Sequence, residues 1–457
     1  MLEQKSLAAF LEAVKKLDAG FADLPAFAPQ APNDEQLIEV LNATAERLSD
    51  NYPYFHPLYA GQMLKPPHPV ARLAYALAMW VNPNNHALDG GRATSAMEKE
   101  AVEELAAMFG WKEFLGHLCG GGTMANLEAL WVSGQLASGK KIVATEQAHY
   151  THRRVSRVLG LEFEPVATDS RGRLDPHQLE KCAKQGDIGT VVVTLGTTAT
   201  GSVDPLPEIL NLRQKYGFRV HADAAYGGYF ALAENLDAAT AAAFAQIGEV
   251  DSIVIDPHKH GLQPYGCGCV LFADPNVGKL YKHDSPYTYF TSSDLHLGEI
   301  SLECSRPGAA AAALWATQKL LPLTRGGEFA RGLERGRSAA LAVYRKLEAD
   351  QRFATAAAPE LDILVFAPRA ASVSEMSSLS RGVFNDAAGH GLHLAVAELP
   401  VAFLQDTLAI NVKRDRPTVT CLRSVLMKPE HLDWVDRIWD ILQSSAKQVC
   451  GRASLHT

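Results

Sequence analysis

Three stretches of the sequence place reactive or small residues directly after runs that are typical of buried strands. In "DSIVIDPHKHG" an apolar run ends at a polar turn that contains Lys259, and in "HADAAYGGYF" Asp223 follows the run "FRV". In "HLCGGGTMAN" the glycines 120–122 precede Thr123 at a predicted helix start. Because parallel strands collect ligands at their carboxyl ends, we expect these residues to share one site.

Lys259 is the most informative of these residues. Most lysines are simply solvated. The strand before Lys259, however, does not alternate between apolar and polar residues as a strand with one face in solvent would, and Asp256, His258 and His260 are its sequence neighbours. We expect a pocket of low dielectric that lowers the pKa of the amine and makes it nucleophilic. Such an amine suits Schiff-base chemistry.

Asp223 needs a partner, because an unpaired buried carboxylate costs several kcal/mol. A lone aspartate is most simply a turn residue or a helix cap. Here Ala224, Ala225, Gly227 and Gly228 make its surroundings unusually small, which favours a flat ligand lying against the backbone.

The glycine turn at 120–122 is a weak signal on its own. Glycines and the free amides of a helix start suit a phosphate, while a tight turn capped by Thr123 explains the same residues. Together, the three stretches match one ligand, pyridoxal 5′-phosphate (PLP): a phosphate on the turn, a ring nitrogen beside Asp223, and an aldehyde bound by Lys259 as a Schiff base.

The elements around these residues predict an α/β fold. Continuous apolar strands alternate with helices of ten or more residues, which is typical of a mostly parallel sheet covered on both faces. The expected strands are "KIVATE", "TVVVTLGTT", "FRVHADAA", "SIVIDPH" and "CGCVLFA". Further on, "LDILVFAP" and "PTVTCLRSVLM" predict strands of a smaller α+β domain. We divide the chain into an N-terminal helical or extended arm (1–80), a large domain (81–321) and a small C-terminal domain (322–457).

Composition excludes several classes of partner. The 457 residues include 43 lysines and arginines against 51 aspartates and glutamates, a net charge of −8, which argues against nucleic-acid or anionic-membrane binding. The longest apolar runs fall short of the roughly 18 residues that span a bilayer. Seven scattered cysteines predict a cytoplasmic protein, and Cys267 with Cys269 indicate packing and no metal site.

The sequence resembles the group II PLP-dependent amino acid decarboxylases, a family that includes aromatic amino acid and glutamate decarboxylases. The resemblance runs from about residue 57 to residue 429. Its motifs, in order, are "GGGTMAN", "EQAHYTH", "LGTTATGSVDP", "HADAAYGG", "DPHKHG", "SRPGAAAAALW" and "LRSVLMKP". It implies the aspartate-aminotransferase fold, called fold type I, with a seven-stranded, mostly parallel sheet in the large domain.

The resemblance implies cofactor contacts at eight positions. They are Gly122, Thr123, His149, Thr198, Asp223, Ala225, His258 and Lys259. Among them Lys259 matches the lysine that binds the aldehyde, Asp223 the carboxylate on the ring nitrogen, and His149 the histidine that stacks on the ring. These three form the expected catalytic set.

The resemblance also implies contacts with the substrate. Arg423 matches an arginine that pairs with a substrate carboxylate, a task its forked guanidinium suits, although a surface ion pair explains it nearly as well. A loop tyrosine protonates the intermediate in relatives, and Tyr287 and Tyr289 are the candidates here. Asp256 stands where several relatives have asparagine.

We therefore expect decarboxylation of an L-amino acid to its amine and carbon dioxide. The first alternative is a PLP-dependent carbon–carbon lyase similar to sphingosine-phosphate lyase, for which "VKRDRP" (412–417) is the only basic cluster to hold a substrate phosphate. A second alternative is a silent protein that keeps the fold, against which Lys259, Asp223 and His149 together speak. The resemblance implies a homodimer with active sites at the interface, and we expect the arm to serve mainly dimerisation.

Overall fold

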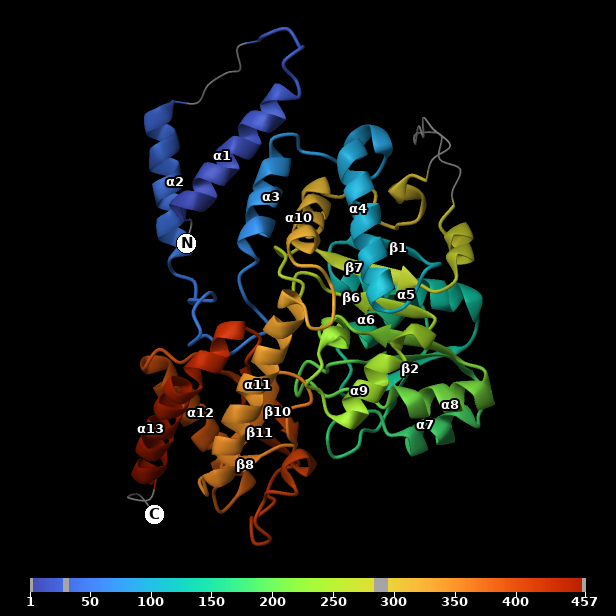
Figure 1. Ribbon diagram of the computed structural model, residues 1–457. Helices are drawn as coiled ribbons and strands as arrows, with labels where there is room; N and C mark the ends of the chain where they lie inside the picture. Colours follow the sequence, from blue (N-terminus) through green and yellow to red (C-terminus); the bar gives the residue numbers. More distant parts are fainter. Residues whose placement is uncertain (1–2, 28–32, 283–294, 454–457) are drawn as a thin grey trace.

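Two sheets and an N-terminal arm organise the chain (Figure 1). The computed structural model describes residues 3–27, 33–282 and 295–453. The larger sheet, with its helices, fills the right side of the view. The smaller sheet lies below and to the left with the C-terminal helices, and the first helices project at the upper left.

The large sheet has seven strands in the order β1-β7-β6-β5-β4-β2-β3. Their bounds are β1 Leu115–Cys119, β2 Lys141–Thr145, β3 Phe163–Val166, β4 Ile188–Thr194, β5 Arg219–Asp223, β6 Ser252–Ile255 and β7 Gly268–Phe272. All neighbours run parallel except β7, which is antiparallel to both β1 and β6. The expected mostly parallel seven-stranded sheet is confirmed.

Burial explains which strands the sequence predicted. Every residue of β4 is buried, and β5, β6 and β7 are buried almost throughout, so these strands carry uninterrupted apolar runs. The sequence did not predict β3, whose "FEPV" contains Glu164 and Pro165. It lies at the edge of the sheet, where a proline costs no ladder hydrogen bond.

Helices cover both faces of this sheet. They are α4 Leu88–Met108, α5 Gly122–Leu136, α6 Thr151–Val158, α7 Pro176–Ala183, α8 Leu206–Tyr216, α9 Ala238–Ala245 and α10 Gly308–Leu320. The helix expected from Thr94 begins earlier, at Leu88, with a break at Gly91.

The small sheet is antiparallel throughout, in the order β10-β11-β9-β8. Its strands are β8 Phe353–Thr355, β9 Ile363–Pro368, β10 Ala395–Pro400 and β11 Thr418–Val425, with helices α11 Glu328–Ala349, α12 Val373–Gly389 and α13 Val435–Ala453. The two strands expected from the sequence are β9 and β11. The others are very short (β8) or only partly buried (β10), so they carry little apolar signal.

The arm comprises α1 Gln4–Ala19, α2 Asp34–Leu48 and α3 Pro69–Met79. Figure 1 shows α3 beside α10, and the two helices are in contact. In contrast, α1 and α2 contain no buried residue. Within the described ranges, no helix combines the length and the apolar character that crossing a membrane requires.

Candidate active site

A cavity of about 580 Å³ lies at the carboxyl ends of the central strands. All eight positions expected to contact a cofactor line it. They are Gly122, Thr123, His149, Thr198, Asp223, Ala225, His258 and Lys259. Residues up to 137 positions apart in the sequence are thus brought together by the parallel order of β2, β4, β5 and β6.

One wall of the cavity is the glycine turn between β1 and α5. A Cβ on Gly122 would lie 2.7 Å from Oδ2 of Asp256, and one on Gly268 would lie 2.6 Å from Cα of Gly121, so only glycines fit. Gly121 has a φ of +144°, which also favours glycine. The amides of residues 122–124 donate to no acceptor in the described part of the chain, and all three residues line the cavity.

Asn126 fixes this helix start against the sheet. Its side-chain Nδ2 donates to the carbonyl of Gly122 (2.8 Å), and its Oδ1 lies 2.8 Å from Nε2 of His221 in β5. Burial lowers the pKa of His221 to about 3, so its ring is neutral and Nε2 can donate to Asn126. The turn and the strand that ends in Asp223 are therefore held in one hydrogen-bonded unit.

Asp223 is the last residue of β5 and is 6% exposed. Its Oδ2 lies 2.7 Å from Nε2 of His152, a fully buried residue of α6, and its Oδ1 accepts from the amide of Ala225. Burial alone would raise the pKa of Asp223, but the hydrogen bond from His152 and the charge of Lys259 hold it well below its usual range. A carboxylate is thus kept ionised inside the protein.

Lys259 lies in the turn after β6, with its Nζ 2.9 Å from Oδ2 of Asp256. The expectation of a lowered pKa is wrong for this arrangement. Burial does lower the pKa of Lys259, but the carboxylates of Asp256 and Asp223 outweigh it and raise the pKa above its usual value. The lysine is therefore held as a cation by two buried carboxylates, and its charge in turn helps to lower the pKa of Asp223.

Two histidines border this charged centre. The Nδ1 of His149 accepts a hydrogen bond from the backbone amide of Thr151 and lies 2.8 Å from Oγ1 of the same residue. Burial lowers the pKa of the His149 ring. His258 packs on the glycine turn, where a Cβ on Gly121 would lie 3.2 Å from its Cε1, and burial lowers its pKa as well. Both imidazoles are therefore mainly neutral at pH 7.

Arg423 is placed differently from the substrate contact that the resemblance implies. It is buried in β11 and does not line the cavity. Its three guanidinium nitrogens donate to the carbonyls of Thr198, Ala199 and Gly61. In this arrangement Arg423 holds the loop that carries Thr198. The expected substrate residues Tyr287 and Tyr289 lie outside the described residues.

Sequence reasoning missed three residues of the site. It noted Asp256 as a departure from relatives without predicting its ion pair with Lys259, and it left out His152, which stands in the same "EQAHYTH" motif as His149. It also missed Glu303, whose carboxylate accepts from the amide of Gly120. No pattern in the sequence points to Glu303.

The residues present fit PLP. The backbone N–H groups of residues 122–124, which donate no hydrogen bond in the described part of the chain, suit a phosphate, because a helix start combines free N–H groups with a favourable dipole. The ionised carboxylate of Asp223 suits a protonated ring nitrogen, and the amine of Lys259 suits an aldehyde. Glu303 occupies only the amide of Gly120 and leaves the other amides available to an anion.

Replacing His152 tests its role as a positioning residue for Asp223. We expect His152→Leu to weaken PLP binding about tenfold or more, since a hydrogen bond to a charged group contributes about 1.5–3 kcal/mol. His152→Gln, which keeps an N–H donor, should recover part of that affinity. The measurement is an absorbance titration of the apoprotein with PLP, with the exposed His177→Leu as control. Equal affinities for the Leu and Gln variants would contradict the role.

Replacing Asp256 tests what raises the pKa of Lys259. In Asp256→Asn the amine loses its nearest carboxylate, so its pKa should fall and the neutral amine should be present at lower pH. We expect the pH midpoint for PLP capture by the apoprotein, followed by absorbance, to move down by about one pH unit or more. The exposed Asp406→Asn is the control. A midpoint unchanged in Asp256→Asn would show that another group sets the pKa.

Comparison with known proteins identifies the family. The model described as "Pyridoxal-dependent decarboxylase conserved domain" matches residues 124–369, more than half of the chain. This segment holds most of the cavity wall, from α5 through β4, β5 and β6 to β9.

Similar curated proteins come from bacteria and archaea. The L-tyrosine decarboxylase of Enterococcus faecium is 29% identical, over 63% of this chain and 64% of that protein. The L-aspartate decarboxylase of Thermococcus kodakarensis is 29% identical, over 62% of this chain and 73% of that protein. The chain thus matches less than two thirds of the length of the Enterococcus faecium protein.

Solved structures share the fold from end to end. Mouse CSAD superposes with a TM-score of 0.77 at 18% identity, covering 98% of this chain and 99% of that one. Oryza sativa TDC, solved with PLP and tryptamine, gives a TM-score of 0.77 at 17% identity with the same coverage. The expected fold type is confirmed, and from its family match and its fold this chain belongs to the pyridoxal-dependent decarboxylase family.

Proposed function

We propose that this protein decarboxylates an L-amino acid to the corresponding amine and carbon dioxide, with PLP as its cofactor. One observation carries the proposal: a single cavity combines Lys259, the ionised Asp223, His149 and the free amides of α5. Membership of the decarboxylase family supports the type of reaction.

When bound, PLP supplies an electron sink that accepts the electron pair left as the carboxyl group departs. Lys259 would hold the cofactor by its aldehyde and yield it to the substrate amine. Whenever Lys259 is not bound to the cofactor, its amine would lie beside the carboxylate of Asp256, 2.9 Å away in the present arrangement. Asp256 thereby keeps the free lysine beside the reacting atoms.

Asp223 would keep the ring nitrogen of the cofactor protonated. Its low pKa means that it stays a carboxylate at any working pH, and a negative charge beside a ring nitrogen raises the pKa of that nitrogen. His149, mainly neutral, borders the same space and can lie on the ring without repelling its positive charge. We assign Gly122, Thr123 and His258 to the phosphate end and Thr198 and Ala225 to further contacts.

The substrate side chain is the least constrained part of the proposal. Relatives are named for tyrosine and aspartate, and a similar structure from Catharanthus roseus is a tryptophan decarboxylase in complex with L-tryptophan. Contact between Arg423 and a substrate carboxylate stays a prediction, since its nitrogens donate to backbone carbonyls here. A role for Tyr287 or Tyr289 as proton donor also stays a prediction.

An assay of carbon dioxide and amine release tests the proposed reaction. The purified protein with PLP is incubated with a panel of L-amino acids that includes tyrosine, aspartate, tryptophan and glutamate. We expect equimolar carbon dioxide and amine from at least one of them, lost in Lys259→Ala and kept in the exposed Lys112→Ala. Bound PLP without carbon dioxide from any amino acid would contradict decarboxylation.

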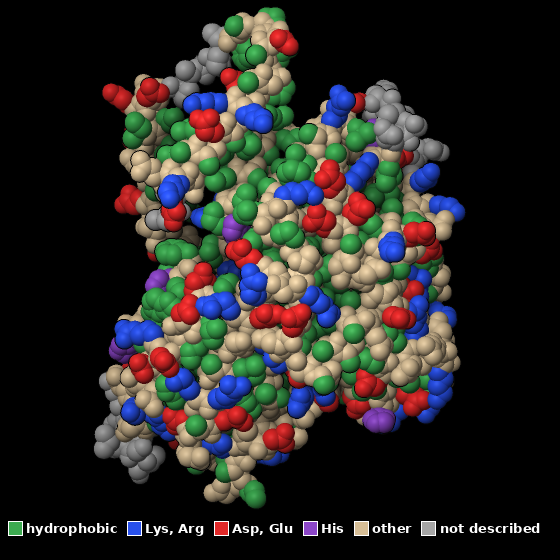
Figure 2. All heavy atoms as spheres, viewed as in Figure 1, with side chains coloured by type: hydrophobic (Ala, Val, Ile, Leu, Met, Phe, Trp, Pro, Cys, Tyr) green, Lys and Arg blue, Asp and Glu red, His purple; other side chains and the backbone are tan. Residues whose placement is uncertain are grey.

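We also propose a homodimer, with its active sites at the interface, in which the arm (1–80) covers the partner. Among the described residues, 15 of the 24 exposed large hydrophobic side chains fall between Leu7 and Val81. Figure 2 shows hydrophobic side chains gathered over the arm at the upper left. Amphipathic helices bury an apolar face, and α1 and α2 bury none within this chain, so a second copy supplies the missing cover.

Sedimentation velocity tests this assembly. Ile38 and Leu41 on α2 are 60% and 58% exposed, so we expect that replacing them with glutamate leaves the fold of one chain intact. We expect Ile38→Glu combined with Leu41→Glu to convert the dimer to a monomer, while Ile410→Glu, outside the arm, stays dimeric. A dimeric double variant, or a monomeric wild type, would contradict the role of the arm.

The large domain (81–321) and the small domain (322–457) complete the proposed division of the chain, and each has its own sheet. We further infer a cytoplasmic protein, on the odd number and scattered positions of its cysteines.

A further inference from the structure

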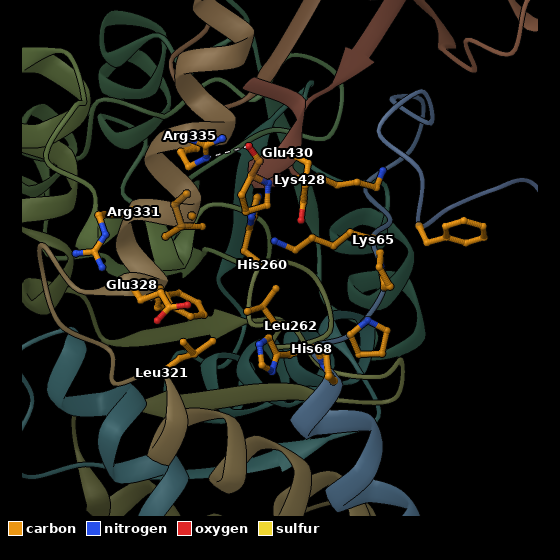
Figure 3. Close-up of a pocket in the computed structure, with 18 of the residues that line it drawn as sticks. Lys65, His68, His260, Leu262, Leu321, Glu328, Arg331, Arg335, Lys428 and Glu430 are labelled. Carbon is orange, nitrogen blue, oxygen red and sulfur yellow. Dashed lines mark hydrogen bonds between the residues drawn. The ribbon is translucent and has the colours of Figure 1, made fainter. Parts of the chain in front are cut away.

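A second cavity, of about 500 Å³, lies where the arm and the two domains meet (Figure 3). The arm contributes the segment around Lys65 to its wall, the large domain contributes His260 and Leu262, and the small domain contributes α11 and the turn at 428–430. It is separate from the candidate active site, since the two cavities share no lining residue.

The wall of this junction cavity carries an excess of positive charge. Five lysines and arginines face two glutamates, in a protein whose net charge is negative. These residues are Lys65, Arg72, Arg331, Arg335 and Lys428 against Glu328 and Glu430. This cluster could not be predicted from the sequence, because its members come from three separate segments, 65–72, 328–335 and 428–430.

Neither lysine forms an ion pair with a described residue, although the charges of nearby carboxylates partly offset the effect of burial on both pKa values. Lys65 donates to the carbonyl of Met427 (3.2 Å) and Lys428 to that of Tyr59 (2.6 Å), and neither ammonium lies within ion-pair distance of a carboxylate in the described residues. Burial lowers the pKa of Lys65 to about 8; burial and the charge of Lys65 lower that of Lys428 to about 7. Both ammonium groups would be stabilised by an anion.

The arginines differ in how many hydrogen bonds and ion pairs their guanidinium groups already make. Arg335 pairs with Asp433 (2.6 Å), and Arg331 donates to the carbonyl of Gly326. The backbone amide of Arg72 on α3 donates to the carbonyl of His68, but its guanidinium makes no hydrogen bond or ion pair with any described residue. Figure 3 shows Lys65 reaching into the cavity toward His260. Lys65 and Arg72 are therefore the cations best available to a ligand.

The remaining wall is apolar and touches the turn that carries Lys259. His260, which follows Lys259 directly, is 1% exposed, and its Nε2 lies 3.3 Å from Oδ2 of the buried Asp362. Leu262 has a φ of +64°, a strained value for leucine, and its carbonyl accepts from the amide of His68. Phe329 and Leu333 add apolar surface from α11.

We propose that the junction cavity binds a small organic anion, with its carboxylate or phosphate group between Lys65 and Arg72 and its apolar part against Leu262 and Phe329. A cavity of this volume with few convergent charges and an apolar wall suits a small molecule. The ligand would contact the arm, the large domain and the small domain at once.

Isothermal titration calorimetry of the PLP-loaded protein at pH 7 and low salt tests the site, because PLP already fills the active-site phosphate position. Inorganic phosphate and succinate are titrated separately as probes of the two anionic groups. We expect one site per subunit for at least one probe, weakened tenfold or more in Lys65→Met and in Arg72→Met. Methionine keeps an unbranched apolar stem, and the exposed Lys140→Met is the matched control.

Binding of phosphate alone or of succinate alone, lost in both cavity variants and kept in the control, supports the site and identifies the anionic group. Binding that survives both substitutions, or no binding of either probe to the wild type, overturns the proposal. Circular dichroism of each variant checks its fold, and the two substitutions lie on separate segments, so a misfolded variant leaves the other as the test.

Discussion

The ion pair between Lys259 and Asp256, with Asp223 close by, is the interaction on which the site depends. A cation and two carboxylates are withdrawn from water at the ends of β5 and β6, and none of them would be stable there alone. The two carboxylates raise the pKa of Lys259, and the charge of Lys259 helps to lower the pKa of Asp223. The site is therefore charged in advance of any ligand.

The fold supplies the precision that this charge cluster requires. The strand ends are fixed by a core that is buried on both faces of the sheet, and the glycines at 121, 122 and 268 let the α5 turn approach Asp256 closely. His152 and Asn126, both buried, link helices α5 and α6 to the strand that ends in Asp223. A carboxylate, an amine and a set of free amides thus meet across one cavity.

Much of the fold could be predicted from the sequence, because strands buried on both faces carry uninterrupted apolar runs. Strands β2 and β4–β7 were predicted on that basis, whereas β3, with Glu164 and Pro165, and the only partly buried β10 carry no such signal. Lys259, Asp223 and Gly122 were found because each follows a strand, and parallel strands end at the same edge. The pKa of Lys259 was predicted with the wrong sign, since burial can be inferred from the sequence but the 2.9 Å distance to Asp256 cannot.

The central claim is that Lys259 is the residue that holds the cofactor. The most direct measurement is borohydride reduction of the PLP-loaded protein, followed by proteolysis and mass spectrometry of the peptides. The account predicts one phosphopyridoxyl group per chain, on Lys259. Modification chiefly at another lysine, such as Lys65 or Lys428 of the junction cavity, would contradict it.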